Sequence, residues 1–369
     1  MSKYPVLAVV TAFSLVLAAC NGEVNSAHSI KGKFVYTAAS FGNIYGYAVN
    51  TTTGSLAPLG VSGVAESFPS TITFNPAGTV AYVLVPQNNA VTTFGINGTT
   101  GVLTPLTSGL VNTGNYPSGV AVAPSGKFAY VTNRDSNDVW GYSINAGTGA
   151  LTLLAGGTVA TGSAPYGLAI DPTGRFVYVT NNNDGTVSAY AINAGTGALT
   201  PVPGSPFVSV NNPGAITVNP AGTVVYAAST TTIVYPGTNN GGISAWSIDQ
   251  TTGALTPIGT VGKGVGYSSI AVNAAGTFVY VGSVNFDGQI ITCAVDSASG
   301  ALTPIAGDSV QADASYSITS ISTSGPLMYV GVGYKVAGYT INTSTGALTA
   351  VPGSPFTQNS SSLVAAVTP

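Results

Sequence analysis

The chain has 369 residues, of which 45% are apolar and only 5% are charged, and its formal net charge is −3. The eight Lys and Arg residues are dispersed and form no basic patch, which argues against nucleic-acid binding. No apolar run after residue 20 approaches the roughly 20 residues that a membrane-spanning helix needs. Polarity is carried by Thr, Ser, Asn and 48 Gly residues instead, a composition typical of a secreted all-β protein with many turns.

The N-terminal segment predicts export. MSKYPVLAVVTAFSLVLAAC combines an early Lys, an apolar stretch and small residues before a cysteine, as a cleaved secretory signal does. Its end, LAAC, resembles the lipobox of bacterial lipoproteins, in which cleavage precedes a lipidated cysteine. The resemblance implies a signal peptide over residues 1–19, a lipid on Cys20 and a tether over residues 20–31. Because residue 21 is not Asp, it also implies an outer-membrane lipoprotein. An ordinary secretory signal is the alternative.

A repeat begins at residue 32 and continues to the C-terminus. Seven copies of a short segment place a Gly four residues before a Tyr, as in GRFVYVTNN at 174–182. Apolar residues occupy both alternating faces of this segment, which predicts a strand buried on both faces. The tyrosines of the seven copies are Tyr36, Tyr82, Tyr130, Tyr178, Tyr226, Tyr280 and Tyr329.

A second motif, of the form TGALTP, follows each copy. An Asn or Asp closes the preceding strand, and a Gly stands four positions later, from Asn50 and Gly54 in the first copy to Asn342 and Gly346 in the last. An Asx side chain can bond its own turn, and Gly can adopt a positive φ. We therefore assign these Asn and Asp residues to hairpin turns and not to a binding site.

Four short antiparallel strands per repeat, copied seven times, predict an all-β seven-bladed β-propeller. The first copy lacks the strand that precedes the Gly-Tyr segment elsewhere, and SSSLVAAVTP at 360–369 offers a matching strand. A C-terminal strand that completes the first blade would close the ring and leave no open sheet edge there. The prediction is one propeller domain over residues 32–369.

The YVTN segments at 130–133 and 178–181 and the TGALTP elements resemble the YVTN-repeat and lactonase-type seven-bladed propellers. This group includes 6-phosphogluconolactonase-like proteins, and the resemblance covers nearly all of the mature chain. It implies the propeller fold, and in enzymatic members it implies His, Glu and Arg near the axis. The sequence departs from that pattern, because its one His, His28, lies in the tether.

Propellers bind ligands at the central funnel, which two sets of loops line. One set leads into the innermost strands, and the other joins the second strand of each blade to the third. Glu66 and Arg134 are the candidate catalytic pair, with an unreactive loop carboxylate and a surface Arg as the alternative. The candidate ligand contacts are Tyr116, Tyr166, Asn212, Tyr267, Tyr316, Asp135 and Asp184.

The oxygen-rich segments 134–138 and 181–185 do not match a calcium loop, so neither a metal nor a cofactor is predicted. Cys293 stands where the other copies have an aromatic residue in the third strand, which predicts a buried apolar filler. If Cys20 carries lipid, Cys293 has no disulfide partner. The long loop from Ser229 to Gly242 is predicted to project on the funnel face, with Tyr235 available for contact.

A charge-poor funnel lined by Tyr, Asn and Thr predicts a lipid-anchored, monomeric binding or scaffold module of the cell envelope, with a carbohydrate, peptide or protein ligand. The alternative function is a lactonase-like hydrolase that acts on a sugar lactone, and it depends on the family resemblance alone. A third possibility is a purely structural surface component.

Overall fold

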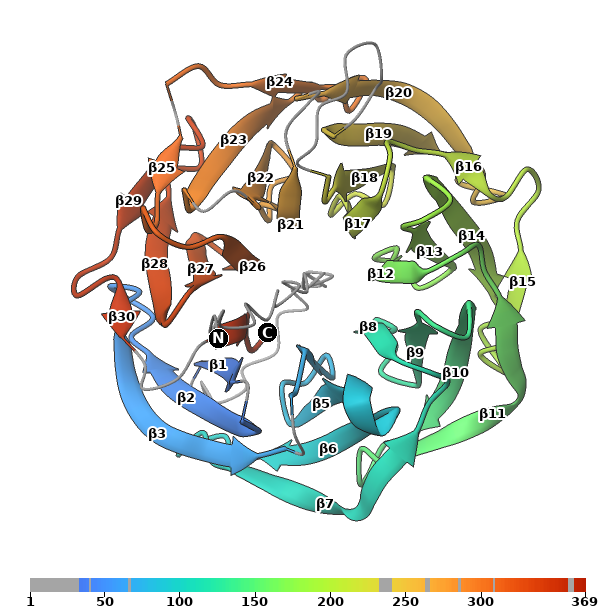
Figure 1. Ribbon diagram of the computed structural model, residues 1–369, viewed down its shortest axis with the longest axis horizontal. Coiled ribbons are helices and arrows are strands. Elements are labelled where there is room, and N and C mark those ends of the chain that lie inside the picture. The colour runs from blue at the N-terminus through green and yellow to red at the C-terminus, as the bar shows by residue number, and fades with distance from the viewer. Residues whose placement is uncertain are drawn as a thin grey trace, which may run out of the picture.

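The repeated strands assemble into seven antiparallel sheets, which are arranged in a ring around one axis (Figure 1). The computed structural model describes residues 33–39, 41–65, 68–231, 241–262, 266–284, 287–307, 309–357 and 362–369. The predicted seven-bladed β-propeller is therefore confirmed. Within these residues, no helix is long and apolar enough to cross a membrane.

In every blade the innermost strand faces the axis and the others follow outward to the rim (Figure 1). Blade 1 contains β31 (Ser362–Val367), β1 (Phe34–Ala39), β2 (Asn43–Val49) and β3 (Leu56–Val64). Blade 2 contains β4 (Thr71–Phe74), β5 (Val80–Val85), β6 (Ala90–Ile96) and β7 (Leu103–Asn112), with a 3-10 turn (Pro86–Asn88) after β5. Blade 3 contains β8 (Pro117–Val122), β9 (Phe128–Asn133), β10 (Asp138–Ile144) and β11 (Leu151–Ala160).

In blades 4, 6 and 7 an additional short strand pairs with the third strand. Blade 4 contains β12 (Pro165–Ile170), β13 (Phe176–Asn181), β14 (Thr186–Ile192), β15 (Leu199–Pro201) and β16 (Phe207–Val208). Blade 5 contains β17 (Pro213–Val218), β18 (Val224–Ser229), β19 (Ile243–Ile248) and β20 (Leu255–Val261). Blade 6 contains β21 (Tyr267–Val272), β22 (Phe278–Ser283), β23 (Gln289–Val295), β24 (Leu302–Pro304) and β25 (Val310–Gln311). Blade 7 contains β26 (Ile318–Ser324), β27 (Leu327–Val332), β28 (Lys335–Ile341), β29 (Leu348–Ala350) and β30 (Phe356–Thr357).

The Gly-Tyr segments form the second strand of each blade, and every residue of these strands is buried, as predicted. Each repeat tyrosine is fully buried and donates its hydroxyl to the carbonyl of the turn glycine in the next blade. The two repeated motifs thus connect neighbouring blades through one tyrosine–glycine hydrogen bond at each of the seven blade junctions. The seven pairs are Tyr36–Gly101, Tyr82–Gly149, Tyr130–Gly197, Tyr178–Gly253, Tyr226–Gly300, Tyr280–Gly346 and Tyr329–Gly54.

The turn glycines follow the predicted Asx turns. In the first blade the Asn50 side-chain oxygen accepts the backbone N–H groups of Thr52 and Thr53 at 3.0 Å, and Gly54 has a φ of +74°. The same pattern recurs in each of the other blades. The Asx residues of this motif are therefore structural, as the sequence indicates.

The ring closes through the C-terminal strand, as predicted. Strand β31 pairs antiparallel with β1, and Val35 lies opposite Val367. Phe34 and Thr368 exchange two hydrogen bonds, of 2.8 and 3.0 Å. Strand β31 also joins blade 7, because Ser320 and Ser322 accept backbone N–H groups from it. The side chains of residues 363 and 364 lie outside the described part of the chain.

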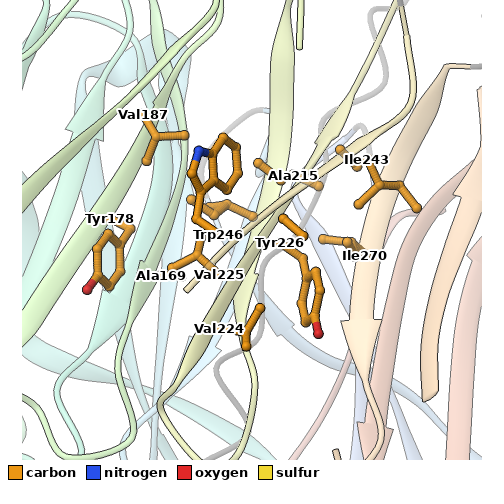
Figure 2. Packing of buried hydrophobic residues seen from close by; sticks show 14 of the residues in the cluster. Ala169, Tyr178, Val187, Ala215, Val224, Val225, Tyr226, Ile243, Trp246 and Ile270 are labelled. Carbon is orange, nitrogen blue, oxygen red and sulfur yellow. The ribbon is translucent and has the colours of Figure 1, made fainter. Parts of the chain in front are cut away.

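The largest cluster of buried apolar residues spans blades 4, 5 and 6, and Figure 2 shows Trp246 and Tyr226 at its heart. Cys293 belongs to the same cluster and is 1% exposed. Burial raises the pKa of its thiol to about 11. The prediction of a buried, unreactive filler is confirmed for Cys293.

Candidate functional site

The loops that lead into the innermost strands and the loops between second and third strands share one face of the ring, which we call the funnel face. In blade 3, for example, β8 begins on this face at Pro117 and β9 ends on it at Asn133. Ser229 ends β18, so the long loop predicted at 229–242 starts on the same face. Residues 232–240, including Tyr235, lie outside the part of the chain that the structure describes.

Four successive blades present an unusual backbone position at this face. Phe68, Tyr116, Ala164 and Asn212 each stand before a proline and have φ values between 49° and 56°. Residues other than glycine rarely adopt this conformation, and it persists only where neighbouring groups hold it. The side-chain oxygen of Asn89 accepts the Tyr116 N–H at 2.8 Å, and Asn137 does the same for Ala164. The loops at Tyr116 and Ala164 are thus held by the preceding blade, so this part of the funnel face is ordered in advance of any ligand.

Arg134 and Tyr116 lie together on this face. The guanidinium carbon of Arg134 stands 5.7 Å from the centre of the Tyr116 ring, and the Arg134 N–H donates to the Tyr116 carbonyl at 2.9 Å. The Arg134 side chain is exposed, and it makes no ion pair or hydrogen bond with any residue that the structure describes. A cation held on an aromatic ring without a counter-charge is suited to bind a carboxylate, a phosphate or a developing oxyanion.

Two predicted carboxylates lie on the same face. Asp135 is exposed, and its backbone N–H donates to the Asn115 carbonyl at 3.1 Å. Its carboxylate has no hydrogen-bond partner within the described chain. The carboxylate of Asp184 instead accepts the backbone N–H of Ser163 at 2.6 Å, which assigns it to the loop. Asp135, which follows Arg134 in the chain, therefore has a carboxylate that makes no hydrogen bond or ion pair with the described residues.

Three other residues that were predicted to contact a ligand make contacts within the propeller itself. Tyr166 is half-buried, and its carbonyl accepts the Thr132 hydroxyl at 3.0 Å. The Asn212 amide bonds the Asn182 carbonyl at 3.3 Å and the Thr231 hydroxyl at 2.8 Å, within the loop network. Tyr267 is only 3% exposed, and burial raises its pKa to about 12. Its selection as a ligand contact was wrong, because the first position of β21 points its side chain into the core.

Tyr316 belongs to a group on blade 7 that sequence reasoning named only in part. Its ring meets the ring of Tyr334 edge to face, with centres 5.7 Å apart and planes at 81°. Beside them, the Lys335 ammonium pairs with the Asp313 carboxylate at 2.5 Å. The hydrogen bond from Lys335 lowers the pKa of the Asp313 carboxyl below its ordinary value. The signal that could have identified the rest of this group is the sequence of the two funnel-face loops of the blade, ADASYS and GYK, which contain Asp313, Tyr334 and Lys335.

Comparison with known proteins identifies the family. The family model of the lactonase seven-bladed β-propellers matches residues 18–114, 106–217 and 203–283. The chain belongs to the lactonase family. No curated protein matches the sequence.

Several solved structures share the fold of this lactonase-family chain. A periplasmic gluconolactonase from Pseudomonas aeruginosa is 17% identical, with a TM-score of 0.71 over 92% of this chain and 99% of that chain. A protein from Lactobacillus plantarum is 19% identical, with a TM-score of 0.75 over 91% and 98%. A candidate 6-phosphogluconolactonase from Bacteroides uniformis is 19% identical, with a TM-score of 0.72 over 91% and 99%. At these identities the likeness establishes the fold.

The predicted partner of Arg134, Glu66, lies outside the described residues, as do Cys20 and His28. The pairing of Glu66 with Arg134 therefore stays a prediction for this lactonase-family propeller. Among the residues that the structure does describe, no group of three His, Cys, Asp or Glu side chains could hold a metal ion. In the segment 134–138, the Asp138 carboxylate accepts the Asn133 amide at 2.7 Å and the Ser136 hydroxyl at 3.0 Å, which makes it part of a turn.

Proposed function

We propose that this lactonase-family propeller hydrolyses a sugar lactone at the funnel face of blade 3, where Arg134 binds the lactone carbonyl. The family match favours a hydrolase over the binding or scaffold module that the composition predicts. The observation that carries the proposal is the Arg134 guanidinium, which is held on Tyr116 and is unpaired among the described residues.

Lactone hydrolysis makes specific demands on such a site. Water adds to the carbonyl carbon, negative charge develops on the carbonyl oxygen, and the ring oxygen then leaves with a proton. The guanidinium N–H groups of Arg134 stabilise the oxyanion as it forms, and afterwards they bind the carboxylate of the product. Tyr116 fixes the guanidinium in place. We assign the role of general base, which accepts a proton from the attacking water, to the exposed carboxylate of Asp135, the next residue in the chain.

The proposal predicts a loss of activity when the charge of Arg134 is removed. Arg134→Gln should lower kcat for glucono-δ-lactone by about 10²–10³-fold, the range seen when one oxyanion donor is removed. Initial rates at constant pH, corrected for spontaneous hydrolysis, measure this change. Lys127→Gln is the matched control, because Lys127 is an exposed cation of the same blade on the opposite face. Equal rates in the two variants would exclude Arg134 from the site.

We also propose that the protein is exported and anchored to the outer membrane by lipid on Cys20. The lipobox-like LAAC sequence supports this location. In cells labelled with radioactive palmitate, the wild-type protein should incorporate label and Cys20→Ala should incorporate none. Cys293→Ala should keep the label, because Cys293 is buried in the propeller. A wild-type protein that stays unlabelled would rule out the lipoprotein assignment.

A further inference from the structure

We propose that the funnel face of blade 7 carries a second binding site, which takes a neutral pyranose unit of a glycan through Tyr316, Tyr334 and Lys335. The site does not depend on the proposed hydrolase. Figure 1 shows blade 7, with β26 to β28, on the opposite side of the ring from blade 3, with β8 to β10.

Two exposed aromatic rings form the apolar part of the site. Tyr316 lies in the loop before β26, and Tyr334 lies in the hairpin between β27 and β28. Tyr316 is 36% exposed and Tyr334 is 48% exposed, although most tyrosines of this chain are buried. The ring planes meet at 81°, and both rings keep part of their surface exposed to solvent. Rings of this kind stack on the C–H face of a sugar, while their hydroxyls remain in contact with water.

Backbone contacts hold the Tyr316–Tyr334 ring pair in position before a ligand binds. Gly333 has a φ of +55°, and a Cβ atom built there would lie 2.5 Å from the Tyr316 ring, so this ring packs directly on the Gly333 backbone. On either side of Tyr316, the Ser315 N–H donates to the Asp313 carboxylate at 2.8 Å, and the Ser317 hydroxyl donates to the Val284 carbonyl at 2.6 Å. A fixed aromatic side chain loses little conformational entropy when it binds.

The charges beside the Tyr316–Tyr334 ring pair indicate which class of ligand the site binds. The Asp313 side chain is 8% exposed and fully engaged, whereas the paired Lys335 side chain is 33% exposed and keeps N–H groups for further acceptors. Because the ion pair is neutral, it offers no net attraction to a phosphate or a carboxylate, in contrast to Arg134. Apolar rings beside a few polar donors suit a neutral molecule that has one apolar face and many hydroxyls. A pyranose with equatorial hydroxyls, such as a β-linked glucose unit, has both features.

Binding of cellobiose to the purified protein tests this site. We expect saturable binding in titrations followed by saturation-transfer NMR, with the strongest transfer to the axial C–H protons of the sugar. Tyr316→Ala and Tyr334→Ala should each weaken binding about tenfold, which corresponds to about 1.4 kcal/mol. Tyr316→Phe retains the ring and should bind within about twofold of the wild type, and Arg134→Gln should bind as the wild type does.

Several outcomes would overturn the proposal. These are wild-type protein that does not bind cellobiose, folded Tyr334→Ala protein that binds it unchanged, or glucuronate that binds through Tyr316 more tightly than cellobiose. Tyr334 is the more exposed of the two rings, so its variant keeps the test valid even if Tyr316→Ala perturbs the loop.

Discussion

Deletion of residues 362–369 is expected to abolish cooperative folding of the propeller. The deletion removes β31, which pairs with β1 over five positions and accounts for the hydrogen bonds between Phe34 and Thr368. Each lost hydrogen bond contributes about 0.5–1.5 kcal/mol, and burial of Val367 contributes about 1.5–3 kcal/mol more. The contacts of β31 with Ser320 and Ser322 of blade 7 disappear as well. The combined loss is comparable to the whole stability of a typical domain, about 5–15 kcal/mol.

Urea unfolding followed by circular dichroism, together with size-exclusion chromatography, measures this effect. We expect the truncated chain to aggregate through its open sheet edge or to unfold without a transition. Removal of residues 21–29 from the predicted tether is the control and should leave the unfolding midpoint almost unchanged. A soluble truncated chain with a wild-type transition would contradict closure of the ring by β31.

The second large effect is expected at Tyr226, which is fully buried in the largest core cluster (Figure 2). Tyr226→Ala leaves a cavity the size of an aromatic ring and should lower the free energy of unfolding by about 3–5 kcal/mol. Tyr226→Phe keeps the ring and removes only the 2.9 Å hydrogen bond to the Gly300 carbonyl of the next blade. It leaves that carbonyl without its partner, so we expect a loss of about 1–3 kcal/mol.

The two Tyr226 variants separate the contribution of ring packing from that of the hydrogen bond between blades. Denaturant unfolding measures the free energy of unfolding of each variant. Tyr45→Phe is the matched control, because Tyr45 is half-buried and its hydroxyl makes no hydrogen bond to the residues that the structure describes. If Tyr226→Phe proved no less stable than Tyr45→Phe, the tyrosine hydroxyls would not contribute to holding the blades together.

The fold could be predicted from the sequence because its signals are local and repeated. The apolar pattern around Tyr178 and the turn signal from Asn193 to Gly197 each act within a few residues, and each recurs in every blade. The tyrosine–glycine hydrogen bonds between blades could not be predicted, because they join residues far apart in the chain. Tyr178 bonds Gly253, 75 residues away, and Tyr329 bonds Gly54, 275 residues away.

The candidate site could be predicted only in part. Arg134 and Tyr116 were both predicted from their loop sequences. Nothing in either loop sequence shows that the Arg134 guanidinium lies over the Tyr116 ring. Tyr267 was misplaced because the sequence YSSIAV does not reveal which face its first residue takes, and the structure buries all six residues. Tyr334 and Lys335 were missed because their importance comes from contact with Tyr316 and Asp313, which belong to a different loop.

The most direct test of the proposed function is the rate at which the wild-type protein hydrolyses glucono-δ-lactone above the spontaneous rate. We expect a rate that is proportional to protein concentration, saturates with lactone and is inhibited competitively by gluconate, whose carboxylate binds Arg134. Cellobiose should leave this rate unchanged, because its site lies across the ring on blade 7 (Figure 1). A rate equal to spontaneous hydrolysis at every protein concentration would contradict the assignment of lactonase activity to this propeller.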